Sequence, residues 1–144
     1  MYFKRNGWLN LGDYVVQLKS DWAVSIIFGV ILSIVHIPVH GYTMYFILKV
    51  IQTHIFFIWA LSSAAPAFLL VFPMGLFFLK AKPFFFGGLT GVVAVVGLIL
   101  FDAAYGFYPT RAFVIEYISL ILFSGIAAYL GRLISQRRIK GVAH

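Results

Sequence analysis

The sequence WAVSIIFGVILSIVHIPVHGYTMYFILKVIQTHIFFIW, from Trp22 to Trp59, decides the fold class of this chain. It is apolar enough to lie in lipid, yet it contains three of the chain's four histidines and one lysine. Because titratable side chains are costly in hydrocarbon, each of them calls for a structural or functional reason.

The composition of the whole chain indicates a membrane protein. Of its 144 residues, 62% are hydrophobic and 10% are charged, and the mean hydropathy is +1.00. Soluble domains are about half apolar and about a quarter charged, so a soluble fold of this size could not bury the apolar surface. We therefore expect an all-α integral membrane protein, with residues 1–144 forming a single polytopic membrane domain.

The net charge of +7 comes from cations that lie beside the apolar segments. There they can contact anionic lipid headgroups and hold the cytoplasmic ends of the spans in place. We therefore expect the lipid bilayer and its anionic headgroups as partners, and no nucleic acid. The chain has no cysteine, which excludes disulfides and thiolate metal sites. The expected lipid-facing basic residues are Lys80, Lys82, Arg132, Arg137, Arg138 and Lys140.

Hydropathy and turn residues predict four transmembrane helices. Residues 1–21 are expected to contain an interfacial amphipathic helix, and residues 132–144 a basic cytoplasmic tail. Pro38 should kink or end the first helix, and residues 42–53 are read as an interfacial or re-entrant helix. An alternative has five spans, the additional one over residues 42–60. The expected four spans are 22–40, 54–79, 84–107 and 112–131.

The distribution of basic residues predicts the orientation of the spans. Cations at Lys80 and Lys82 and in the C-terminal tail belong on the cytoplasmic side, which puts both termini in the cytoplasm when there are four spans. Five spans would place Lys49 near the middle of the membrane, at a cost of about 2.5–3.5 kcal/mol. We therefore favour four spans in a cell membrane, and the short turns are typical of a bacterial inner membrane.

His36 and His40 are the first candidate site. They stand one helical turn apart, so their side chains could share a face and provide two ligands of one metal ion. The zinc-protease pattern is absent, because Ile37 and not a glutamate follows His36. The structural alternative is that both imidazoles lie at the outer interface and hydrogen bond to water or backbone.

The four-span topology extends this candidate site to residues from other helices. It places His36, His40, Asp102 and Glu116 in one outward-facing layer, which predicts an ion or proton site. A simpler explanation is a structural ion pair between Arg111 and one of the two carboxylates. Two further residues stay open: His54 as a ligand, and Lys49 as a counter-charge or as a side chain that reaches the interface.

Small residues four apart indicate where helices approach closely. Gly87 with Gly91, and Ala127 with Gly131, form small-x-x-x-small patterns. Such patterns are equally consistent with packing inside one chain and with contacts between copies.

Three functional classes follow from these features. The first is a transporter or channel component that handles a proton, cation or small solute as an oligomer or in a complex. The second is a non-catalytic interaction protein, such as an accessory subunit or an immunity or exclusion factor. The third is a haem- or quinone-binding subunit, with His36 or His40 opposite His54 as b-type haem ligands, a pattern that any membrane protein with three histidines offers. We favour the first class and expect no enzyme activity and no cofactor, with a metal ion at the two histidines left open.

Overall fold

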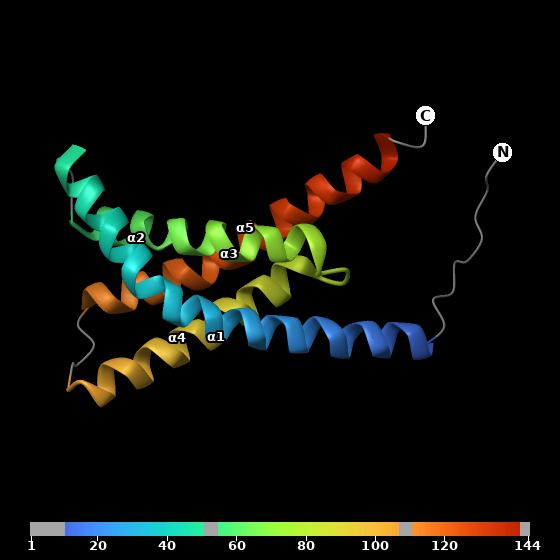
Figure 1. The fold of residues 1–144 in the computed structure, drawn as a ribbon, viewed down its shortest axis with the longest axis horizontal. Helices are drawn as coiled ribbons and strands as arrows, with labels where there is room; N and C mark the ends of the chain where they lie inside the picture. Colours follow the sequence, from blue (N-terminus) through green and yellow to red (C-terminus); the bar gives the residue numbers. More distant parts are fainter. Residues whose placement is uncertain (1–10, 51–54, 107–110, 142–144) are drawn as a thin grey trace.

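Helices make up the described part of the chain in the computed structural model, which covers residues 11–50, 55–106 and 111–141 (Figure 1). No strand occurs within these ranges. The prediction of an all-α protein is therefore confirmed. The helices are α1 (Leu11–Val50), α2 (Ile55–Ser62), α3 (Ala64–Phe77), α4 (Pro83–Ala104) and α5 (Arg111–Gly141).

Four segments of the described chain are long and apolar enough to cross a membrane. Helices α2 and α3 together form one of these spans, so the four-span prediction is confirmed over the five-span alternative. In Figure 1 the beginning of α1 and the end of α5 lie at the same end of the bundle, as four passes require. The four spans are Val16–Leu48, Phe57–Phe77, Pro83–Ala104 and Phe113–Arg137.

Helix α1 differs from the expected boundaries. It runs without a break through 40 residues, whereas the sequence suggested an interfacial helix, a span ending near Pro38 and a separate segment over residues 42–53. Pro38 removes one hydrogen bond but does not end the helix, because an interrupted backbone in lipid would lack partners for its polar groups. Figure 1 shows α1 changing direction as its colour passes from blue to cyan, and Pro38 lies inside this helix.

The second span is interrupted between α2 and α3, close to Pro66. Because proline removes a helix hydrogen bond, Pro66 and Pro73 favour bends, and hydroxyls such as those of Ser62 and Ser63 can satisfy backbone groups freed at a bend. The hydroxyls of Ser62 and Ser63 both donate to the carbonyl oxygen of Trp59, at 3.0 and 3.1 Å. Pro73 lies inside α3 without ending it.

A short turn joins α3 to α4 and is tied to the beginning of α1. Lys82 adopts a left-handed conformation with φ +38°, and Pro83 begins α4, where its missing N–H is tolerated. The carboxylate of Asp21, which is buried in α1, accepts a hydrogen bond of 2.9 Å from the main-chain N–H of Ala81. This contact holds the turn against the first span.

The small-residue patterns pack helices of the same chain against each other. Gly87 and Gly91 of α4 face α5, and a Cβ atom on Gly91 would come 2.7 Å from the Cα of Ile121. Ala127 is fully buried, and Gly131 contacts the α3 backbone. These glycines therefore serve packing inside the chain.

The basic residues near the C-terminus, expected in a cytoplasmic tail, belong to the last helix as far as Gly141. Helix α5 continues ten residues beyond the expected end of the last span, as far as Gly141. Arg137 is exposed, as are Lys80 and Lys82, whereas Arg132 is half-buried and its Nε has no hydrogen-bond partner within the described part of the chain. The side chains of Arg138 and Lys140 lie outside the described residues.

Candidate functional site

The buried face of α1 carries the first two site residues. Buried positions recur every three or four residues along this helix, as expected for one face turned toward the bundle. His36 and His40 belong to this face, and their rings stack with centroids 4.9 Å apart, so the bend near Pro38 does not separate them. The buried positions of α1 from its beginning to the site are Asp21, Ser25, Gly29, Leu32, His36 and His40.

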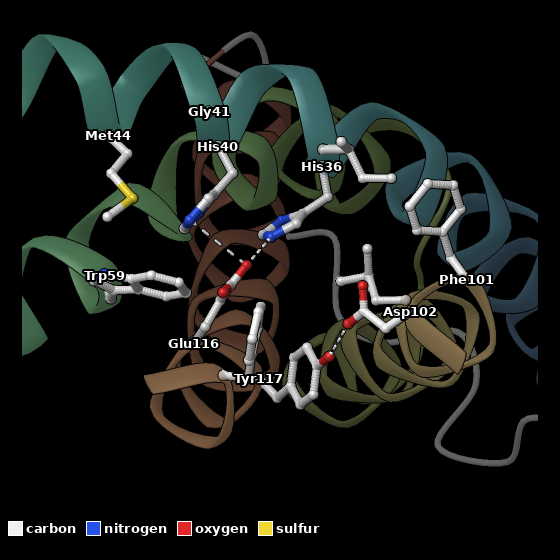
Figure 2. Close-up of a pocket in the computed structure, with 12 residues that line it drawn as sticks. His36, His40, Gly41, Met44, Trp59, Phe101, Asp102, Glu116 and Tyr117 are labelled. Carbon is white, nitrogen blue, oxygen red and sulfur yellow. Dashed lines mark hydrogen bonds and ion pairs between the residues drawn. The ribbon is translucent and has the colours of Figure 1, made fainter. Parts of the chain in front are cut away.

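Glu116 of α5 points its carboxylate between the two imidazoles (Figure 2). Its Oε1 lies 2.6 Å from Nε2 of His36 and 3.6 Å from Nε2 of His40. All three side chains are buried. The cost of burying an ionised carboxylate is lowered by a short hydrogen bond such as the one to His36. The sequence placed these three residues in one layer, and the structure brings them into contact.

His40 has a second polar partner on the opposite side of its ring. Its Nδ1 lies 3.1 Å from Oγ of Ser62, at the end of α2. The same ring packs edge to face against Trp59, at a centroid distance of 5.8 Å. His36, by contrast, has a buried Nδ1 without a hydrogen-bond partner among the described residues.

Asp102 occupies a neighbouring position and not the centre of the cluster. The hydroxyl of Tyr117 donates a hydrogen bond of 2.7 Å to Oδ2 of Asp102, which connects α4 to α5. Asp102 is half-buried. Figure 2 shows Asp102 and Tyr117 beside the His36–Glu116 contact.

A pocket of about 220 Å³ lies next to these groups. His36, His40, Asp102 and Glu116, the four site residues predicted from the sequence, all line it. Its other walls are mainly apolar and aromatic, and they include the thioether of Met44. The arrangement is therefore a polar cluster facing a largely apolar chamber. The remaining lining residues are Ile37, Gly41, Met44, Trp59, Leu98, Phe101, Phe113 and Tyr117.

Three further predicted site residues lie outside the side chains that the structure describes. They are Arg111, Lys49 and His54, so the proposed ion pair of Arg111 and the haem pairing through His54 remain predictions. The neighbours found for Glu116 are imidazoles.

Two site residues were not found by the sequence reasoning. The sequence indicates only a helix-bend role for Ser62, which also contacts His40. The sequence does not indicate Tyr117, because adjacent residues on a helix point in directions about 100° apart and the inward position of Glu116 does not imply that of Tyr117. In the sequence, the only feature that distinguishes Ser62 and Ser63 is that they lie close to Pro66. This feature indicates a helix bend and not a hydrogen bond to a histidine of the site.

Two imidazoles and one carboxylate from two spans can share and hold a cation. Imidazole nitrogens and carboxylate oxygens are the common ligands of divalent transition metals, and buried ionisable groups in spans mark ion pathways in many membrane proteins. No protein-family model, curated protein or solved structure matches this chain.

Proposed function

We propose that this protein is a component of a membrane transporter or channel that passes a cation, and that it acts as an oligomer or in a complex. One observation carries the proposal: His36, His40 and Glu116 are buried together inside the membrane-spanning segments. Ionisable groups in spans are expensive, and where they are retained and paired they commonly line ion or substrate paths.

The convergence of these groups favours transport over the interaction-protein alternative. An interaction protein would recognise its partner through outward-facing groups, and its ionisable residues would be scattered over the surface. Here Glu116 and both histidines point inward, and Asp102 lines the same pocket. A polar cluster of this kind supports ion binding in the bundle.

The interior of the single chain supports the oligomeric part of the proposal. On the buried face of α1, Leu32 separates the histidines from the polar pair Asp21 and Ser25 nearer the beginning of the helix, and it has no exposed surface. The described helices thus pack an apolar core between two polar levels. A continuous path would need a second copy, a partner protein or a rearrangement of α1.

The basic residues support a cytoplasmic position for the C-terminus. Lys80 and Lys82 lie in the turn between α3 and α4, and α5 carries Arg137 toward the same end of the bundle (Figure 1). The positive-inside rule then places the site toward the outer side of a cell membrane. We propose a bacterial inner membrane on the same argument.

Flux measurements on the purified full-length protein in liposomes test this proposal. Vesicles containing dyes for Zn²⁺, Ca²⁺ or K⁺ would receive the cation outside, and we expect uptake of one cation above that of empty vesicles. Glu116→Gln should abolish this uptake. Asp13→Asn, the same chemical change outside the Val16–Leu48 span, should leave it unchanged. Equal uptake by vesicles with the unchanged protein and by empty vesicles would overturn a cation path formed by this chain or its oligomer.

A further inference from the structure

One ring nitrogen of His36, one ring nitrogen of His40 and a carboxylate oxygen of Glu116 all lie within 4.8 Å of one another. We infer that these three atoms bind one divalent transition metal ion, principally Zn²⁺. The fourth coordination position of the ion faces the adjoining pocket. This inference deepens the proposed function and rests on it for the role of the ion as cargo, but binding itself can be measured without transport.

The two distances from Glu116 to the histidines fit a tetrahedral ion after a small movement, and the two imidazole nitrogens lie within 4.8 Å of each other. Zinc-to-ligand bonds of about 2.0–2.1 Å separate neighbouring tetrahedral ligands by about 3.3 Å. His40 Nε2 lies 3.6 Å from Glu116 Oε1, close to this spacing. His36 Nε2 lies nearer, at 2.6 Å, because a hydrogen bond joins the two atoms. Binding would replace that shared proton with the metal ion and move the atoms apart by less than about 1 Å.

The hydrogen bond of His40 directs a free nitrogen toward the cluster. Ser62 has one hydroxyl proton, which it donates to the carbonyl of Trp59, so its oxygen accepts from Nδ1–H of His40. A neutral imidazole with its proton on Nδ1 presents an unprotonated Nε2, and this is the atom that faces Glu116. Metal-binding histidines commonly have such an outer partner, which fixes the ring and its tautomer.

His36 can expose the same nitrogen by moving its proton within the ring. In the hydrogen-bonded arrangement Nε2 of His36 donates to Glu116, and its buried Nδ1 has no partner among the described residues. Transfer of the proton to Nδ1 keeps the imidazole neutral and leaves Nε2 as a ligand. Metal-binding histidines usually have a hydrogen-bond partner on the nitrogen that does not bind the metal. Nδ1 of His36 has none among the described residues, and the packing around it does not explain why this polar atom is buried.

The types of ligand determine which cations fit. Mg²⁺ and Ca²⁺ prefer sites made of oxygen ligands, whereas two imidazoles with one carboxylate are typical of Zn²⁺ and other first-row transition metals. The two histidines also have the i, i+4 spacing with which one helix presents two zinc ligands. The stacking of their rings, 26° from parallel, keeps both on the side of Glu116.

The pocket gives the bound ion an accessible position. Three protein ligands leave one tetrahedral position for water or for an incoming ligand, as in open zinc sites. The pocket of about 220 Å³ adjoins His36, His40 and Glu116. An ion held this way can be exchanged, which suits cargo better than a closed four-ligand structural site.

Metal titration of the purified full-length protein tests the inference. After treatment with a chelator, Co²⁺ should produce the visible absorption bands of a tetrahedral site, Zn²⁺ should remove them, and excess Mg²⁺ should not. Glu116→Gln and His36→Gln should weaken Co²⁺ binding by about 100-fold or more, beyond the 10–100-fold effect of losing an outer partner. Asp13→Asn and His144→Gln are the matched controls and should bind normally. Unchanged binding in Glu116→Gln would overturn the assignment.

A measurement on the unchanged protein keeps the inference testable if the variants fold poorly. X-ray absorption at the zinc edge should show scattering from two imidazoles, and a shell of oxygen ligands alone would overturn the inference. Zinc binding without flux in the liposome experiment would retain the metal site and overturn transport by this chain or its oligomer. Flux of another cation without zinc binding would retain transport and overturn the metal site.

Discussion

The hydroxyl of Ser62 lies 3.1 Å from Nδ1 of His40, although 22 residues separate them along the chain. This contact joins the interrupted second span to the buried histidine face of α1. Helix α2 ends at Ser62. At this helix end the hydroxyl donates to the carbonyl of Trp59 and also lies against the imidazole of His40. The break in the second span therefore contributes directly to the site.

Ser62→Ala should weaken metal binding without removing a ligand. The change deletes the acceptor for Nδ1–H of His40, and loss of an outer partner costs about 10–100-fold in affinity. Co²⁺ titration of the purified protein measures the effect. Ser63→Ala is a close control, because Ser63 also donates to Trp59 but is not a partner of His40. Equal affinities of the two variants would show that Ser62 does not position the ring.

Tyr117→Phe should reduce stability while leaving metal affinity unchanged. The tyrosine hydroxyl donates to Asp102 across the α4–α5 contact, and a hydrogen bond to a charged group contributes about 1.5–3 kcal/mol. Because Asp102 is half-buried, we expect a loss of about 1 kcal/mol in unfolding free energy. Titration with a denaturing detergent would measure it.

The matched control for this change is Tyr105→Phe. Tyr105 is exposed, with a relative accessibility of 68%, and its ring packs against Phe101, so removing its hydroxyl should change stability by less than about 0.5 kcal/mol. A large drop in metal affinity in Tyr117→Phe would instead indicate that the Asp102 pair supports the metal ligands.

The sequence predicted the class of fold and the level of the site because both depend on local patterns. Long apolar runs indicate the spans, and positive charges indicate which end of each span is cytoplasmic. Together they place Glu116 and Asp102 near the histidines. The continuity of α1 through Pro38 could not be predicted in the same way. It depends on whether the surroundings offer partners for a broken backbone, and in lipid they do not.

Sequence patterns also could not predict the contacts between residues that lie far apart along the chain. Asp21 reads as a polar residue just before the expected first span, yet it is buried and accepts a hydrogen bond from Ala81. The contact of Ser62 with His40 is of the same kind. Each requires the relative rotation and depth of two helices, which come from packing small residues such as Gly91 against a neighbouring backbone.

Cysteine labelling at the two ends of α4 should establish the orientation of the protein. Lys80 and Tyr105 are both exposed and flank this span, and the chain has no native cysteine. With an impermeant thiol reagent on intact cells, we expect labelling of Tyr105→Cys but not of Lys80→Cys, because basic turns stay in the cytoplasm. Both positions should react after permeabilisation.

Other labelling patterns would change specific conclusions. Labelling of Lys80→Cys alone would invert the protein and place the His36–Glu116 cluster toward the cytoplasm. Labelling of both positions in intact cells would contradict α4 as a membrane span.

Substituting Gly88 and Gly91 of α4 separately by alanine should distinguish the effect of packing from that of helix propensity. A Cβ on Gly91 would meet the α5 backbone at Ile121, whereas a Cβ on Gly88 meets no atom within 4 Å. Gly91→Ala should therefore force α4 and α5 apart and cost about 1–3 kcal/mol. Gly88→Ala should be neutral or stabilise by up to about 1 kcal/mol, because alanine favours the helix.

Detergent-induced unfolding of both glycine variants measures the difference, and metal affinity gives a second measure of the same contact. Glu116 lies on α5 while both histidines lie on α1, which packs against α4. A displaced α4 should therefore also lower Co²⁺ affinity in Gly91→Ala, and not in Gly88→Ala. If both variants bind Co²⁺ alike, the close approach of α4 and α5 is not what holds Glu116 against the histidines.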